Sequence, residues 1–82
     1  GPNGRLTIKG ISGFSRVEIS IFDRWGDLVF QENNYRNDDP WLGYFSGKPL
    51  PQAAYYYYLK AWDGNVQVGG TQTGVVHLFT QE

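Results

Sequence analysis

The sequence predicts an all-β fold, a two-sheet antiparallel β-sandwich of about seven short strands. Short apolar segments repeat with a period of two, which is typical of strands that bury one face. Glycine, proline, asparagine and aspartate recur between these segments at close spacing, as turns require. No part of the 82-residue chain shows the period of an amphipathic helix.

A β-hairpin over residues 17–30 is the clearest element. The segment before its turn alternates apolar and polar residues, with one apolar face made by Val17, Ile19 and Ile21. Residues 28–30 after the turn favour strand structure. Asp23 and Gly26 bound a four-residue turn, because aspartate bonds its own backbone and glycine tolerates positive φ.

The two central residues of this turn, Arg24 and Trp25, are unusually large for their position. One interpretation is that Trp25 folds back over the end of the sheet, with Arg24 stacked on it or paired with an acid. The other interpretation is direct binding of a partner. A large ring near a strand end usually packs, so we expect the first.

On the N-terminal side of the hairpin, Leu6 and Ile8 predict a first strand that Gly10 ends, followed by a turn with two apolar anchors, Ile11 and Phe14. On its C-terminal side, residues 31–47 predict a long loop. We expect this loop to pack on the sandwich, because it carries four rings, Tyr35, Trp41, Tyr44 and Phe45.

Residues 48–51, which contain two prolines, predict a rigid extended segment before a long strand over residues 53–62. One face of that strand is the better core candidate: Tyr55, Tyr57, Leu59 and Ala61. The other face predicts a half-exposed aromatic stripe: Tyr56, Tyr58, Lys60 and Trp62.

A turn over residues 63–65 leads to a short strand with Val66 and Val68, a bulge or bend at Gly69 and Gly70, and a last strand over residues 74–79. Together these elements predict an immunoglobulin-like arrangement of the two sheets.

Composition points to one small domain, which we expect over residues 3–82, with Gly1 and Pro2 as the remnant of a cleaved expression tag. The chain has no cysteine, and its net charge of −1 provides no basic patch for nucleic acid. No apolar segment approaches the length of a membrane-spanning helix.

Catalytic and cofactor chemistry has little support in the sequence, so we expect no enzyme, no cofactor and no bound metal. The single histidine, His77, lies in an expected strand, where a structural role is more common than a catalytic one. The polar residues of the long loop could supply calcium ligands but lack the spacing of a calcium-binding loop, so a solvated turn is the simpler interpretation: Asn33, Asn34, Asn37, Asp38 and Asp39.

Several segments together resemble one family, the gliding-motility-associated C-terminal domain, which is the type B sorting domain of type IX secretion in Bacteroidetes. Residues 21–30 resemble its I-[FY]-[ND]-R-W-G-x-x-V-F core, and later positions match its aromatic loop, its Leu-Pro and tyrosine run and its last strand: Tyr35, Trp41, Gly43, Gly47, Leu50, Pro51, Tyr55, Tyr56, Tyr57, Gly74, Val76 and Leu78. The chain differs from the family pattern at residues 3–4, at Leu42, at Ala53 and Ala54, and at residues 80–82.

The resemblance implies a non-enzymatic sorting signal that directs an attached upstream cargo across the outer membrane, to the cell surface or the medium. Its partner would be the outer-membrane secretion machinery or a cargo-specific outer-membrane protein. The candidate recognition or family-motif residues are Arg24, Trp25, Gly26, Trp41, Gly43, Leu50, Pro51, Tyr56, Tyr58 and Trp62.

Two expectations follow from these candidates. Trp41, between Pro40 and Gly43, should be buried against the sheet near the Arg24–Trp25 turn. The alternative function is a carbohydrate-binding or adhesive module of a secreted protein, in which Tyr56, Tyr58 and Trp62 form a stacking platform.

Overall fold

The computed structural model describes residues 6–78. The expected tag remnant at residues 1–2, the Phe79 end of the last strand, and the family differences at residues 3–4 and 80–82 lie outside this range. The described elements are a three-residue 3₁₀ helix, η1 (Ile11–Gly13), and six strands: β1 Arg16–Phe22, β2 Leu28–Glu32, β3 Tyr44–Phe45, β4 Lys48–Pro49, β5 Ala53–Asp63 and β6 Val66–Leu78. The predicted all-β fold is confirmed.

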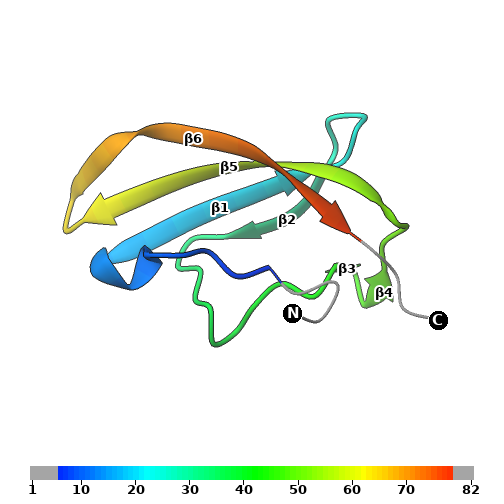
Figure 1. The fold of residues 1–82 in the computed structure, drawn as a ribbon, viewed down its shortest axis with the longest axis horizontal. Helices are drawn as coiled ribbons and strands as arrows, with labels where there is room; N and C mark the ends of the chain where they lie inside the picture. The colour runs from blue at the N-terminus through cyan, green and yellow to red at the C-terminus, as the bar shows by residue number, and fades with distance from the viewer. Residues whose placement is uncertain (1–5, 79–82) are drawn as a thin grey trace.

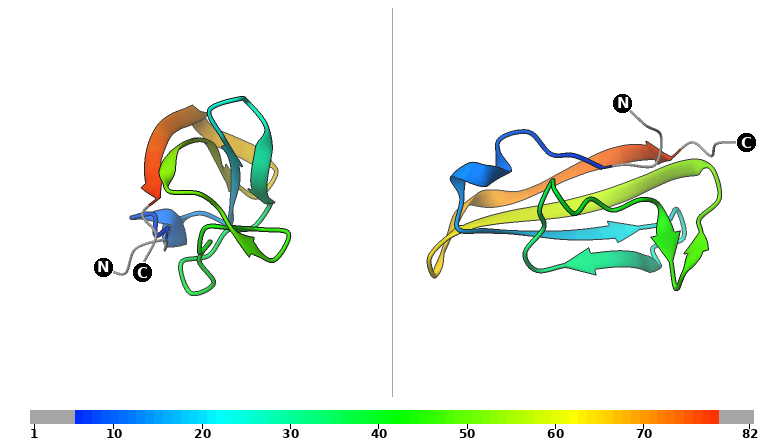
Figure 2. Two further views of the ribbon diagram at one scale, coloured as in Figure 1. Left: turned by 90° about the vertical axis from the view of Figure 1, so that its right-hand side faces the viewer. Right: turned by 90° about the horizontal axis from the view of Figure 1, so that it is seen from below.

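Four strands form the main sheet in the order β2-β1-β5-β6, with every neighbouring pair antiparallel, and β3 pairs with β4 in a small second sheet. Figure 1 shows the main sheet as one twisted layer, with β3 and β4 below one end of it. The views in Figure 2 show that the N-terminal segment (blue) and the long loop (green) lie on the same side of this sheet. The second layer is therefore mostly irregular chain.

The hairpin of β1 and β2 forms as predicted, because its sequence satisfies both the sheet and the turn. Val17, Ile19 and Ile21 are buried while their neighbours in β1 are only partly so, as a period of two requires. At the turn, Oδ1 of Asp23 accepts hydrogen bonds from the backbone N–H groups of Trp25 and Asp27, each at 2.9 Å.

The hairpin of β5 and β6 differs from the prediction in one respect. The sequence predicts two short strands after residue 65 with a bulge or bend between them at Gly69 and Gly70. The structure has the bulge, but β6 is continuous from Val66 to Leu78. Gly69 has a φ of 69° and lies where the pairing with β5 shifts register. The glycines therefore make a bulge inside one strand, and β5 is long enough to pair on both sides of it.

The expected first strand at Leu6 and Ile8 is wrong, since these residues belong to no strand. The long loop satisfies their main-chain groups instead. The Asn37 amide accepts a hydrogen bond from the Ile8 N–H at 2.8 Å and donates one to the Ile8 carbonyl at 2.7 Å. The Leu6 N–H donates to the Trp41 carbonyl at 3.0 Å. A side chain thus takes the place of a neighbouring strand.

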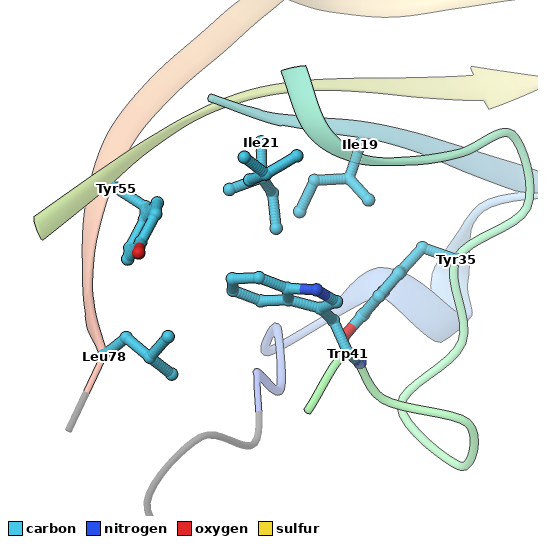
Figure 3. Packing of buried hydrophobic residues seen from close by; sticks show 7 residues of the cluster. Ile19, Ile21, Tyr35, Trp41, Tyr55 and Leu78 are labelled. Carbon is cyan, nitrogen blue, oxygen red and sulfur yellow. The ribbon is translucent and has the colours of Figure 1, made fainter. Parts of the chain in front are cut away.

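A single cluster of buried side chains joins the sheet to its irregular cover: Ile19, Ile21, Val29, Tyr35, Trp41, Tyr55 and Leu78. Figure 3 shows Trp41 at its centre, below Ile19 and Ile21 and between Tyr35 and Tyr55. The Trp41 ring centroid is 5.8 Å from that of Phe30 and 6.2 Å from that of Tyr55. The expectation that the loop packs on the sheet is confirmed for Tyr35 and Trp41. It is wrong for Tyr44 and Phe45, which are exposed on the small hairpin.

One buried hydroxyl connects three segments of the cover. The Tyr35 hydroxyl accepts a hydrogen bond from the Trp41 N–H at 2.8 Å and donates one to the Leu6 carbonyl. Burial raises the pKa of this phenol, so it remains a neutral donor over the physiological range. The Tyr35 N–H donates to the Val17 carbonyl at 2.8 Å, which ties the same residue to β1.

We predict that Tyr35→Phe lowers the free energy of unfolding by about 1–3 kcal/mol, because the ring is kept while a buried N–H and a carbonyl lose their partner. Urea denaturation followed by tryptophan fluorescence measures the change. The control is Tyr44→Phe, which removes a hydroxyl from an exposed ring. Equal stability of the two variants would show that the Tyr35 hydroxyl has no structural role.

Candidate functional site

The structure divides the candidate residues among three places. Arg24 and Trp25 meet Leu50 and Pro51 at one end of the sheet, and Gly26 belongs to the same turn as Arg24 and Trp25. Trp41 and Gly43 belong to the core and its cover. The remaining three lie on the sheet face opposite the core: Tyr56, Tyr58 and Trp62.

The turn between β1 and β2 presents its tryptophan to solvent. Trp25 is 74% exposed, which contradicts the expectation that it folds back over the sheet end. The reason is the turn itself, which extends beyond the sheet (Figure 1). Hydrogen bonds to Asp23 close this turn, and other rings fill the core. The expected stacking of Arg24 is confirmed, with its guanidinium carbon 4.8 Å from the Trp25 ring centroid.

A hollow of about 250 Å³ lies between this turn and the segment that leads into β5, and we call it the corner hollow. Its lining residues are Asp23, Arg24, Trp25, Leu50, Pro51, Gln52, Ala53, Ala54 and Tyr55. Two stretches separated by more than twenty residues of sequence, the Arg-Trp turn and the Leu-Pro segment, therefore form one surface feature.

One wall of the corner hollow is the segment that leads into β5, and hydrogen bonds hold this wall in place. The Tyr55 hydroxyl donates to the Pro51 carbonyl at 2.8 Å, and the Leu50 N–H donates to the Gly43 carbonyl at 2.8 Å. Burial, and to a smaller extent the Asp23 carboxylate, raise the pKa of Tyr55, which keeps its hydroxyl a donor. The wall is thus attached to the core through Tyr55.

Trp41 and Gly43 have structural positions. Trp41 is 5% exposed, which confirms its expected burial. Its ring contacts the ring of Tyr55, and Tyr55 in turn lines the corner hollow. Gly43 has a φ of 83°, and a Cβ at this position would lie 2.7 Å from Cδ1 of Leu78. Both residues belong to the cover that supports the corner hollow.

The face of the main sheet opposite the core carries the predicted aromatic stripe. Tyr56 and Tyr58 are exposed, and the Tyr58 ring meets Phe22 edge-on, with centroids 5.3 Å apart. Trp62 is only partly exposed, because the Arg16 guanidinium lies over its ring at 4.8 Å from the centroid. Only two of the three rings therefore present open surface.

The expected absence of a metal site can be compared with the part of the chain that the structure describes. No group of three or more His, Cys, Asp or Glu side chains there could hold a metal ion. The polar loop residues have local roles: Asn37 holds Ile8, and Asp38 forms a salt bridge to Arg36 at 2.7 Å. Nor does any helix within residues 6–78 have the length and apolar character to cross a membrane.

Sequence reasoning missed Asp23, Gln52 and Tyr55 as neighbours of the candidate residues. Asp23 was assigned only to the turn, and Tyr55 only to the core. Asp23 and Tyr55 each contribute hydrogen bonds to the framework and also line the corner hollow, and Gln52 lines it beside them. The alternation of strand faces gave a signal for Tyr55, because a core residue at the start of a strand also reaches the sheet end.

Comparison with known proteins identified one family. The family model of the CHU_C Type IX secretion signal domain matches residues 1–78 of the chain. A search of curated proteins found no match, and a search of solved structures also found none.

Trp41→Ala and Trp25→Ala should differ sharply in stability. Removing the buried Trp41 ring should lower the free energy of unfolding by about 3–5 kcal/mol, whereas removing the exposed Trp25 ring should change it by less than about 0.5 kcal/mol. Thermal denaturation followed by far-ultraviolet circular dichroism provides the measurement. A large loss of stability in Trp25→Ala would show that its ring packs on the protein.

Gly43→Ala and Gly26→Ala form a second matched pair, because their φ angles are 83° and 84°. Both should lose about 1–2 kcal/mol from left-handed backbone strain. Gly43→Ala should lose more, since only its new methyl group meets Leu78. Chemical denaturation compares the two, and equal losses would mean that Leu78 moves aside freely.

Proposed function

The chain belongs to the CHU_C type IX secretion signal domain family, and from this membership we propose that it acts as a folded sorting signal recognised at the corner hollow. The signal would direct an attached upstream cargo across the outer membrane, to the cell surface or the medium. Its partner would be a component of the outer-membrane secretion machinery or a cargo-specific outer-membrane protein.

The exposure of Trp25 is the observation that carries this proposal. Burying a tryptophan ring removes a large apolar area from water, so a domain this small gains stability by burying its rings. Here the turn holds the Trp25 ring in solvent, and Arg24 stacks on it. Tryptophan and arginine are the residues most enriched at the energetic centres of protein interfaces.

The neighbours of Trp25 fit a protein partner. Leu50, Pro51 and Ala53 give the corner hollow an apolar wall, and Asp23 and Arg24 place charged groups of both signs at its rim. An apolar centre with a polar rim is typical of protein interfaces. Because Tyr55 and Leu50 fix this wall through hydrogen bonds, little conformational freedom would be lost on binding.

The geometry offers less support for a carbohydrate platform. Flat stacking needs open ring faces, and Arg16 covers one face of Trp62 while Phe22 contacts the Tyr58 ring. No ring arrangement on the open sheet face therefore favours a second function over recognition at the corner hollow.

Export of a reporter tests the proposal. A periplasmic reporter fused to the chain, with its natural upstream neighbour included, should reach the surface or medium of a Bacteroidetes host that has type IX secretion. In a strain without the machinery it should stay in the periplasm. If it stays in the periplasm of both strains, the sorting function is wrong.

The same assay tests the site. The double variant Arg24→Ala/Trp25→Ala should keep its thermal stability, since both side chains lie on the exposed turn, but lose most export. The control is Tyr44→Ala, which removes an exposed ring away from the corner hollow. Export of the double variant at the level of the control would show that recognition takes place elsewhere on the domain.

A further inference from the structure

The turn between β1 and β2 is organised around one residue, Asp23. Oδ1 of its carboxylate accepts hydrogen bonds from the N–H groups of Trp25 and Asp27, each at 2.9 Å. Its own N–H donates to the Asp27 carbonyl at 2.9 Å, and its carbonyl accepts from the Gly26 N–H at 3.0 Å. The side chain and the main chain of Asp23 therefore both fix the course of residues 23–27.

The ring that this turn carries has an apolar surface beside it. Trp25 is 74% exposed, yet it lines the corner hollow, and the wall across from it includes the apolar side chains of Leu50, Pro51 and Ala53. Burying a tryptophan ring removes a large apolar area from water, which favours movement of the ring into the hollow. The exposed position of the ring therefore needs a restraint.

We propose that Asp23 is a positioning residue, whose Oδ1 holds the turn in the conformation that keeps the Trp25 ring out of the corner hollow. The hollow then stays open for an apolar side chain of the partner, and Trp25 stays at its rim. Any effect of Asp23 on export rests on the proposed recognition at the corner hollow. Its effect on the position of the ring is independent of a partner.

The restraint depends on an acceptor atom and not on negative charge, because one oxygen accepts both hydrogen bonds. Asparagine at position 23 would present the same Oδ1 to both N–H groups, whereas alanine would present no acceptor. Asp27 offers a matched comparison. It carries the same charge, is exposed, and takes part in the hydrogen bonds to Asp23 through its main chain.

Positioning by Asp23 would also raise the affinity for a partner. The Arg24 guanidinium carbon lies 4.8 Å from the Trp25 ring centroid, so the cation and the ring are presented together. A partner that binds them in this position does not first have to draw the ring out of the hollow. When only a fraction of the molecules has an open hollow, the apparent affinity falls by that fraction.

Exposure of the Trp25 indole tests the positioning directly. A soluble gadolinium chelate enhances the relaxation of indole N–H protons according to their exposure. We expect Asp23→Ala to lower this enhancement at Trp25 about twofold or more, because the ring moves into the hollow. Asp23→Asn and Asp27→Ala should leave it unchanged. The Trp41 indole N–H, which donates to the Tyr44 carbonyl at 3.1 Å, reports in the same spectra that the core stays folded.

Two results of this measurement would overturn the proposal. An equal or larger enhancement at Trp25 in Asp23→Ala would mean that the ring stays exposed without the acceptor. A lowered enhancement in Asp23→Asn would mean that the acceptor does not hold the ring.

Hydrogen exchange of the unmodified chain tests the restraint even if Asp23→Ala fails to fold. The main-chain N–H groups of Trp25 and Asp27 should exchange with water about tenfold or more slowly than in an unstructured peptide, because Asp23 binds both. Exchange at the rate of an unstructured peptide would show that Asp23 does not restrain the turn.

Export of the reporter separates the positioning from the sorting function. At a temperature at which all variants are folded, Asp23→Ala should lower export about fivefold or more, because fewer molecules have an open hollow. Asp23→Asn and Asp27→Ala should export like the unmodified chain. If the Trp25 ring enters the hollow in Asp23→Ala and export stays the same, the positioning is supported and recognition at the corner hollow is wrong. If neither the ring nor export changes, Asp23 is not a positioning residue.

Discussion

The structure depends on satisfying the main-chain polar groups of an irregular layer that covers one face of the sheet. A second sheet would satisfy such groups through its own ladder, but this chain covers its core mostly with loop. Buried N–H and carbonyl groups without partners are costly, so side chains take over the pairing. The Tyr35 hydroxyl serves Trp41 and Leu6, and the Asn37 amide serves Ile8 on both sides.

Hydrogen bonds from side chains to the main chain also explain how a chain without cysteine fixes a long loop. The rings of the core cluster bury apolar area, while the polar atoms of Tyr35 and Tyr55 reach main-chain groups at the border of the core. Tyrosine suits this task because its ring packs and its hydroxyl both donates and accepts. Tyr55 extends the arrangement to the corner hollow, so the core of the domain positions the surface that we assign to recognition.

The buried rings and their hydrogen bonds stabilise only the part of the domain that lies under the irregular cover. Under the cover, the rings of Tyr35, Trp41 and Tyr55 are buried, and the two tyrosine hydroxyls form hydrogen bonds with main-chain groups. Beyond it, the β1–β2 turn holds Trp25 in solvent. The Trp25 turn is rigid because Asp23 accepts two backbone hydrogen bonds. A rigid turn with an exposed ring is a means of binding another protein.

The sequence by itself determined the elements whose signal is local. The alternation of Val17, Ile19 and Ile21, the turn chemistry of Asp23 and Gly26, and the two faces of β5 all follow from backbone preferences and the period of a strand. Only the tertiary structure decided the rest, because those outcomes depend on contacts between residues far apart in the chain. The pairing of Ile8 with the Asn37 side chain replaced an expected strand, and β5 kept β6 continuous through its bulge. The meeting of the Arg24–Trp25 turn with Leu50 and Pro51 arises in the same way, since no local pattern states which distant segment shares the end of a sheet.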